Sequence, residues 1–324
     1  MTSLPHLSRR VLLALGLSLA PLAARAAYPE RPLRLVLPFG AGSATDTFLR
    51  LIAEPLQAAL GQGVVVDNKP GALSSLALAE VAKAAPDGYT VVAATNSIVA
   101  NPAGVQRSTA YDPLRDFTPV TRLGMTSYVL VVAADKPWQS IAELVEHARA
   151  NPGKLNYASG NLGGVLYGGM LARSIGVSMT HVPYKSTPQG LIDLLGGQVQ
   201  LMFTDLVTGL GQAKAGKVRP LLATATRRTA LFPDVPTIAE SGLRNIADMP
   251  AWWSLYGPAG MPREAVERLN REIVAILARP ELRAHLLTLG VEATPSTPEE
   301  LAAFTREQLQ AYQRLIKDFS IQPE

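Results

Sequence analysis

The sequence predicts an α/β fold with two domains, and three observations lead to this prediction. Short runs of β-branched and other apolar residues alternate with amphipathic stretches along most of the chain. This pattern is typical of βα units on a mainly parallel sheet. The alternation is too regular for an all-α or all-β fold. With 324 residues, 48% of them hydrophobic, the chain is long enough for two domains that each have a core.

The predicted elements follow one another along the chain in a regular order. The predicted strands are 33–37, 64–66, 90–94, 128–133, 155–158, 179–182 and 199–203. The predicted helices are 47–60, 74–84, 141–150, 165–174, 188–195, 263–278, 280–289 and 298–318. Because the chain turns mostly helical after residue 253, we expect a C-terminal helical layer that returns to cover an earlier lobe.

The N-terminus has the layout of a signal peptide. A polar stretch that ends in Arg9 and Arg10 precedes the apolar run 11–20, and a small-x-small motif follows at 24–26. The apolar run is too short to span the roughly 30 Å core of a bilayer. We therefore predict export to the periplasm with cleavage near Ala26. The arginine pair also resembles a twin-arginine signal, and the Sec route stays open.

Composition excludes several classes of function. The chain carries 30 basic and 26 acidic residues, but three of the arginines lie in the predicted signal peptide, which itself has no acidic residue. The mature chain is therefore close to neutral and lacks the basic field that nucleic acid would require. With no cysteine, the chain forms no disulfide, thiolate metal site or cysteine nucleophile. The four histidines are dispersed, so no metal site is expected.

A glycine-containing loop follows the first predicted strand. Residues 40–46 read Gly-Ala-Gly-Ser-Ala-Thr-Asp and lead into a helix. Such a loop presents backbone N–H groups, and the helix N-terminus adds its positive dipole end, so a carboxylate would fit there. The alternative is a plain strand-to-helix turn capped by Thr45 or Asp46, which the local sequence alone favours. The loop is neither a P-loop nor a convincing dinucleotide fingerprint.

Three further turns also follow predicted strands, at 68–72, 157–164 and 181–185. Taken singly, each is only a turn. All four loops lie at the carboxyl ends of strands, where ligands bind in open α/β sheets. Two lobes facing each other would therefore form a cleft lined by these loops.

A series of short motifs extends from Tyr28 nearly to the C-terminus. The motifs are 28–36 (YPERPLRLV), 38–39 (PF), 67–72 (DNKPGA), 85–90 (APDGYT), 111–113 (YDP), 157–159 (YAS), 181–185 (HVPYK), 196–199 (GGQV), 215–219 (AGKVR), 233–237 (PDVPT), 259–260 with 262 (AG, P) and 268–270 (RLN). Each is weak alone. In this order, the chain resembles the substrate-binding subunits of tripartite tricarboxylate transporters, which are called Bug or TctC-like receptors.

The resemblance implies a two-lobe periplasmic-binding-protein fold, type II-like, with two chain crossovers. One lobe would combine residues 28–124 with 249–324, and the other would be residues 125–248. It also implies no catalysis and no cofactor. The expected function is capture of a small organic carboxylate or related solute between the lobes. The captured solute would be delivered to the membrane subunits of the transporter, and a monomer is expected.

The resemblance also implies ligand contacts from loops of both lobes. They are Phe39, Gly40, Gly42, Ser43, Ala72, Ser159, His181, Tyr184 and Asp205. The loop 40–46 departs from the usual Pro-Pro-Gly-Gly-Gly-Thr-Asp of the family, and Leu73, Ser74 and Ser186 stand where the family usually has glycine. These departures narrow the space and add hydroxyls, so the ligand class stays open among dicarboxylates, aromatic carboxylates, amino acids and neutral vitamins.

Two other classes of function fit some of the same residues. A periplasmic sensor that reports its bound state to a signalling partner would bind and close in the same way as a transport receptor. A periplasmic hydrolase would need Ser43 or Ser159 beside His181, but no Gly-x-Ser-x-Gly elbow is present. An aspartate that opens a helix, such as Asp205, is more often a cap. His181 is likewise more often a structural hydrogen-bonding group.

Overall fold

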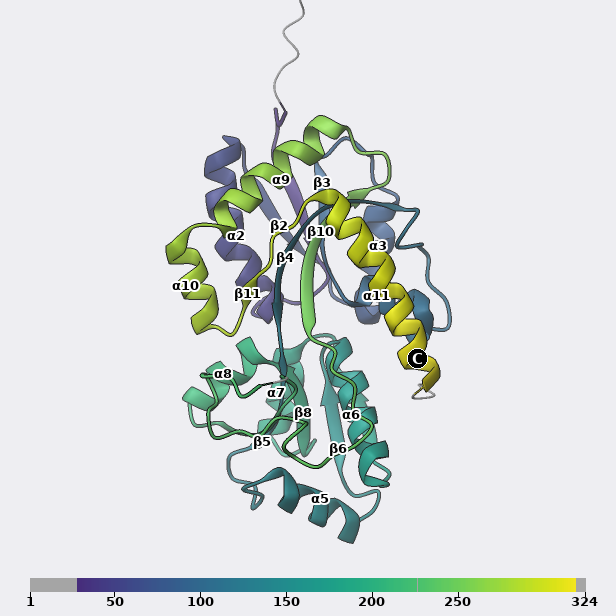
Figure 1. The fold of residues 1–324 in the computed structure, drawn as a ribbon, viewed down its shortest axis with the longest axis vertical. Coiled ribbons are helices and arrows are strands. Elements are labelled where there is room, and N and C mark those ends of the chain that lie inside the picture. The colour runs from purple at the N-terminus through teal and green to yellow at the C-terminus, as the bar shows by residue number, and fades with distance from the viewer. Residues whose placement is uncertain (1–27, 226, 319–324) are drawn as a thin grey trace, which may run out of the picture.

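The computed structural model describes residues 28–225 and 227–318. These residues form two α/β lobes stacked along the long axis, each built on one β-sheet (Figure 1). The predicted fold class, with two lobes, two crossovers and a C-terminal helical layer, is confirmed. The predicted signal peptide, residues 1–26, lies outside the described residues. Among the described helices, none is long and apolar enough to cross a membrane.

The first lobe contains a six-stranded mixed sheet. Its strands are β1 (Leu33–Leu37), β2 (Val64–Asn68), β3 (Thr90–Thr95), β4 (Phe117–Thr126), β10 (Ala251–Pro258) and β11 (Glu292–Ala293). Their order across the sheet is β11-β4-β10-β3-β1-β2. β1 pairs in parallel with β2 and β3, whereas β10 runs antiparallel to both β3 and β4.

The second lobe contains a five-stranded sheet. Its strands are β5 (Tyr128–Ala133), β6 (Asn156–Ser159), β7 (Thr180–Pro183), β8 (Leu201–Asp205) and β9 (Val218–Ala223). Their order is β7-β6-β8-β5-β9, with β6 parallel to β7 and β8 and β5 antiparallel to β8 and β9. Both sheets are therefore mixed rather than mainly parallel. The antiparallel pairs involve the strands that lie next to the crossovers.

Helices cover both sheets. The first lobe contains α2 (Ala44–Leu60), η1 (Ala72–Ser74), α3 (Ser75–Ala82), α4 (Ser97–Ala100), η2 (Asn101–Val105), α9 (Arg263–Leu277), α10 (Pro280–Thr288) and α11 (Pro298–Asp318). The second lobe contains α5 (Ile141–Ala150), α6 (Leu162–Ile175), α7 (Thr187–Leu195) and α8 (Leu206–Lys214). The C-terminal helices return to the first lobe, where α2 and α9 lie on one side of the sheet and α3 and α11 on the other (Figure 1).

Each face of the first sheet has its own hydrophobic core. On one face, Trp253 and Leu269 pack in a buried cluster with the apolar side of α2. On the other face, Trp252 belongs to a cluster that includes α11 and continues into the second lobe through Tyr128 and Tyr167. Because successive side chains of a strand point to opposite faces, the neighbouring tryptophans of β10 belong to different cores.

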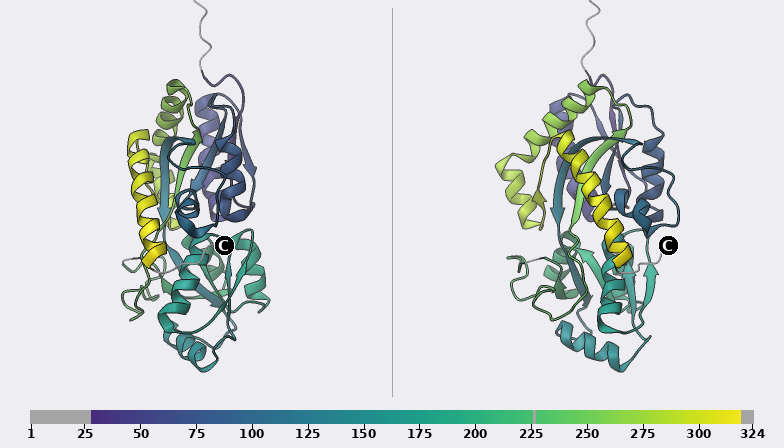
Figure 2. Two further views of the ribbon diagram at one scale, coloured as in Figure 1. Left: turned by 90° about the vertical axis from the view of Figure 1, so that its right-hand side faces the viewer. Right: turned by 45° about the vertical axis from the view of Figure 1, so that its right-hand side comes forward.

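The chain passes between the sheets twice. Ser127 links β4 directly to β5, and Met249 and Pro250 lead into β10. The backbone N–H of Met249 donates to the Tyr167 hydroxyl at 2.8 Å, which anchors the second crossover to α6. Pairing between β4 and β10 continues to Thr126. The lobe bounds 28–124 with 249–324 and 125–248 stay a prediction. Figure 2 shows α11 along one flank of the first lobe, with its C-terminal end beside the second lobe.

We predict that Leu269→Ala destabilises the protein by about 2–5 kcal/mol, because it leaves a cavity between α9 and the sheet. Leu269 is 0% exposed. The matched control is Leu287→Ala on α10, where the side chain is 59% exposed and the expected change is within about 0.5 kcal/mol. Urea unfolding of both variants measures the difference, and equal losses would contradict the packing of α9 described above.

Candidate functional site

Two adjoining cavities lie between the lobes. The larger has a volume of about 330 Å³ and the smaller about 30 Å³. Phe39 of the first lobe and Asn161 and Leu162 of the second line both cavities. Gly40 and Ser186 mark a close approach of the two lobes, since a Cβ on Gly40 would lie 3.5 Å from the Ser186 side chain. The cleft is therefore narrow, and its walls come from the carboxyl ends of strands, as the loop positions predicted.

Four helices begin around the smaller cavity. Its lining includes Ala44, Leu162 and Thr187, which are the first residues of α2, α6 and α7, and Asp205, the N-cap of α8. A helix N-terminus presents unsatisfied N–H groups and a partial positive charge. The cavity thus lies at the meeting point of four positive dipole ends.

The positive end of α2 is already neutralised by a carboxylate of the chain itself. Asp46 is 5% exposed and accepts hydrogen bonds from the Gly42 N–H at 3.0 Å and from Asn68 Nδ2 at 3.1 Å. Arg50 Nε donates to the same carboxylate at 3.0 Å. Desolvation alone would raise the pKa of Asp46, but these hydrogen bonds and the Arg50 charge together hold it below its usual range. The 40–46 loop therefore binds an internal anion.

The N-cap residue predicted for α2 was wrong. Ser43, rather than Thr45 or Asp46, is the N-cap, and its hydroxyl accepts from the Asp46 N–H at 3.2 Å. Thr45 instead accepts a hydrogen bond from Trp253 Nε1 at 2.8 Å. α2 consequently begins three residues earlier than the predicted 47–60, because the capping hydroxyl lies inside the glycine-containing loop.

The start of α8 carries the second internal carboxylate. Asp205 is 5% exposed, and its side chain accepts from the Thr208 N–H at 2.8 Å. Burial removes water from the carboxyl group and raises its pKa, a stronger effect than the capping hydrogen bond. Asp205 is thus both a helix cap, as the sequence suggested, and part of the cavity wall.

The starts of α6 and α7 have no acidic residue in their first turns. Asn161 caps α6 by accepting from the Gly164 N–H at 2.9 Å. Ser186 occupies the N-cap position of α7 without a side-chain capping bond. Both helices therefore direct uncompensated positive dipole ends toward the cavity, and both belong to the second lobe.

The larger cavity is walled on one side by a loop with unusual backbone angles. Ala72, Leu73 and Ser74 have φ values of 45°, 46° and 78°, which is the left-handed region. Such angles cost roughly 1–2 kcal/mol per residue for side chains other than glycine. Asn101 Nδ2 donates to the Leu73 carbonyl and Gln106 Nε2 donates to the Ala72 carbonyl, each at 2.8 Å. These bonds hold the strained loop in place.

Ser74 places a buried hydroxyl in this wall. The residue is 2% exposed, and its Oγ has no hydrogen-bond partner among the described residues. A buried, unpaired hydroxyl is costly unless something else satisfies it. In the sequence, Ser74 stands out only as a residue at a position where the family usually has glycine. The sign of such a site in a sequence is a residue with a side chain at a position where glycine would relieve backbone strain.

The β6–β7 edge supplies further polar groups. Ser159 Oγ and His181 Nε2 are 2.6 Å apart, and the His181 ring stacks on Tyr157 at 4.9 Å. Ser159 is 1% exposed, so this pair braces neighbouring strands. The Tyr184 hydroxyl donates to Asp193 at 2.7 Å, while Lys185 is exposed on the cavity lining. Lys185 is the one charged residue among the described residues that line the larger cavity.

The structure brings six of the nine predicted contact residues to the two cavities. Those six are Phe39, Ser43, Ala72, Ser159, Tyr184 and Asp205. Of the other three, Gly40 faces Ser186, the Gly42 N–H is bonded to Asp46, and His181 lies behind Ser159. Whether each of the nine touches a ligand stays a prediction. In the described part of the chain, no group of histidine and acidic residues is arranged to hold a metal ion.

A family model matches residues 48–321 of the chain and is described as the tripartite tricarboxylate transporter family receptor. Among curated proteins, a protein encoded in the tcbD–tcbE intergenic region of Pseudomonas sp. strain P51 is 34% identical over 319 residues. That alignment covers 97% of this chain and 95% of the relative.

Solved structures of similar proteins have the same fold. The periplasmic binding protein BugD has a TM-score of 0.87 and 32% identity, covering 92% of this chain and 100% of its own. A Rhodopseudomonas palustris protein solved with adipate has a TM-score of 0.87 and 33% identity, with coverage of 92% and 100%. MatC from the same species, with bound malate, has a TM-score of 0.83 and 32% identity, with coverage of 89% and 100%.

We predict that Asp205→Asn raises the melting temperature of the ligand-free protein near neutral pH. Because burial raises the pKa of Asp205, the folded state favours the protonated form. This stabilisation is present below the ordinary aspartate pKa of about 3.9 and is lost as pH rises through the raised value. Asparagine keeps the cap without the charge. Melting curves between about pH 4.5 and 8 measure the effect. A variant that gains most at the acidic end would contradict it.

Proposed function

Because the chain belongs to the tripartite tricarboxylate transporter receptor family, whose members are periplasmic solute-binding receptors and not enzymes, we propose that it captures a small carboxylate between its lobes. The carboxylate would then be delivered to the membrane subunits of a tripartite tricarboxylate-type transporter. Export would depend on the predicted signal peptide, residues 1–26, cleaved near Ala26. The receptor would act in the periplasm as a monomer.

The observation that carries this proposal is the pair of uncompensated helix starts in the second lobe. α6 and α7 begin at the smaller cavity without an acidic residue in their first turns. Helix N-termini bind carboxylates through backbone N–H groups and the dipole. α2 and α8, which begin at the same cavity, already have Asp46 and Asp205 at their starts. A ligand carboxylate would therefore lie nearer to Leu162 and Thr187 than to Ala44.

The remainder of the ligand would occupy the larger cavity. A volume of about 330 Å³ suits a small organic acid. The Ser74 hydroxyl would gain its missing partner there, and Lys185 would face a second anionic group from the rim. Two solved relatives contain the dicarboxylates adipate and malate. A ligand with two acidic groups would use both ends of the cleft.

Capture would be coupled to lobe closure about the two crossovers, a hinge transition. The close approach of Gly40 and Ser186 supports a conformation in which the lobes already meet at one point. A ligand bridging the lobes would favour that conformation over a more open one. Closure would then create the surface that the membrane partner recognises.

We predict that dicarboxylates stabilise the refolded, ligand-free protein and that their diamides do not. Adipate and malate should raise the melting temperature by mass action at micromolar to millimolar concentrations, because they bind the folded state only. Adipamide has the length of adipate but no charge, so it serves as the matched control. Equal stabilisation by adipate and adipamide would contradict an anion site, and no response to a broad acid panel would remove carboxylate capture altogether.

We predict opposite effects of Ser74→Gly on stability and on binding. Loss of the hydroxyl should weaken carboxylate binding by about tenfold, the value of one good hydrogen bond. Relief of the left-handed strain should raise the stability of the ligand-free protein by up to about 1 kcal/mol. Ser74→Ala is the matched variant, since it removes the hydroxyl but keeps the strain. Calorimetric titration and urea unfolding measure both properties, and unchanged affinity in both variants would exclude Ser74 as a ligand contact.

A further inference from the structure

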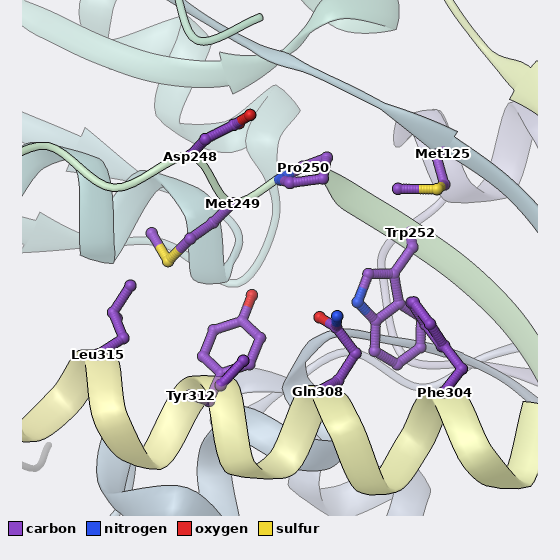
Figure 3. Close-up of a pocket in the computed structure, with 10 residues that line it drawn as sticks. Met125, Asp248, Met249, Pro250, Trp252, Phe304, Gln308, Tyr312 and Leu315 are labelled. Atoms are coloured by element: carbon purple, nitrogen blue, oxygen red, sulfur yellow. The ribbon is translucent and has the colours of Figure 1, made fainter. Parts of the chain in front are cut away.

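A third cavity lies at the hinge, apart from the interlobe cleft. Its volume is about 150 Å³, and it lies between α11 and the second crossover. Figure 3 shows Phe304, Gln308, Tyr312 and Leu315 extending from α11 toward the segment that carries Asp248, Met249 and Pro250. Met125, near the end of β4, contributes from the first crossover. The cavity therefore contacts both segments that connect the lobes.

A buried donor without an acceptor lies in the wall of this cavity. Trp252 is 1% exposed, and its Nε1–H has no hydrogen-bond partner among the described residues. Figure 3 shows the indole nitrogen on the side of the ring that faces Gln308 and Tyr312. The neighbouring Trp253 is different, since its Nε1–H donates to Thr45 Oγ1 at 2.8 Å. Because an unpaired buried donor is costly, a molecule in the cavity that accepts a hydrogen bond from Trp252 would stabilise the protein.

The other walls are mostly apolar. Met125, Met249, Pro250, Phe304 and Leu315 surround the space. Methionine side chains adapt readily to ligands of different shape. Asp248, Gln308 and Tyr312 are the polar residues of the described lining. A volume of about 150 Å³ holds a molecule the size of benzene. A single ring with one polar atom therefore fits both the size and the mixed lining of the cavity.

Asp248 is the one charged residue among the described residues that line this cavity. The residue is exposed, and no hydrogen bond or ion pair to its carboxyl is found in residues 28–225 and 227–318. Partial loss of water raises the pKa of this carboxyl. A carboxylate in the cavity would find no cationic side chain among the described lining residues. A neutral molecule would need none.

We propose that the hinge cavity is a second binding site, for a small neutral ring compound that offers one hydrogen-bond acceptor to the Trp252 indole N–H. The site differs from the interlobe cleft in both position and ligand charge, and it does not depend on the proposed function. Its occupant would contact both crossovers and α11. Binding there would therefore change the affinity of the cleft, and by linkage a cleft ligand would change the affinity of the hinge site by the same factor.

The test uses the indole N–H signals of the ¹⁵N-labelled full-length mature protein in nuclear magnetic resonance. Trp252→Phe assigns the Trp252 signal and removes the donor together with part of the indole ring. Phenol should move the Trp252 signal downfield in a saturable way, as a new hydrogen bond forms. Toluene, which has the same ring without an acceptor, should bind about tenfold more weakly. Benzoate should bind more weakly than phenol, because no cationic side chain is among the described residues that line the cavity. The Trp253 signal reports on the cleft, so adipate should move that signal first.

Two results would overturn the proposal. One is a Trp252 signal that does not respond to phenol up to its solubility limit. The other is equal phenol affinity in the wild type and in Trp252→Phe. Ala311→Phe gives a second variant in case Trp252→Phe does not fold, because Ala311 lines the cavity from the partly exposed side of α11. Filling the cavity should abolish the phenol response. Adipate should still move the Trp253 signal, with an affinity changed in the same direction as phenol changes it in the wild type, which separates this site from the cleft.

Discussion

The position of β10 in the middle of the first sheet is the constraint on which the rest of the structure depends. It pairs with β3 on one side and β4 on the other, directly after the second crossover. Its neighbouring tryptophans face opposite cores. Trp253 packs against Phe48 with ring centroids 5.0 Å apart, and Trp252 packs against Phe304 at 5.2 Å. Through these two contacts, β10 places the start of α2 at the cleft and holds α11 against the hinge.

The electrostatics of the cleft are divided unequally between the lobes. In the first lobe, the start of α2 is neutralised by the buried Asp46, which also fixes the loop and Asn68. In the second lobe, α6 and α7 begin without acidic residues, and only α8 has an aspartate cap. An anion between the lobes would be attracted mainly by the second lobe. The first lobe would contribute shape, through Phe39, and hydrogen bonding, through Ser74.

The alternation of strands and helices was predictable because the first βα units have strong, uninterrupted patterns. The strands β4, β9, β10 and β11 were not predicted. Pro119, Pro220 and Gly257 interrupt the apolar patterns of the first three, and β11 has only two residues. The loops at the strand ends were also predicted correctly as cavity walls. A single sequence could not show that the Asp46 carboxylate would accept a hydrogen bond from the backbone of the 40–46 loop, because that depends on the path of the chain in three dimensions. The unpaired hydroxyl of Ser74 depends likewise on its tertiary burial.

The left-handed turn at 72–74 shapes the cleft at a cost to the stability of the fold. At Leu73 and Ser74, glycine would be the easier residue for the backbone. The Leu73 side chain packs against the hydrophobic core, whereas the Ser74 hydroxyl has no partner among the described residues. Both side chains line the larger cavity and set its form and polarity. In evolutionary terms, substitution of Ser74 by glycine would be tolerated by the scaffold, because it relieves backbone strain and removes no hydrogen bond made among the described residues. The polarity of this wall could therefore change between relatives without passing through unstable intermediates.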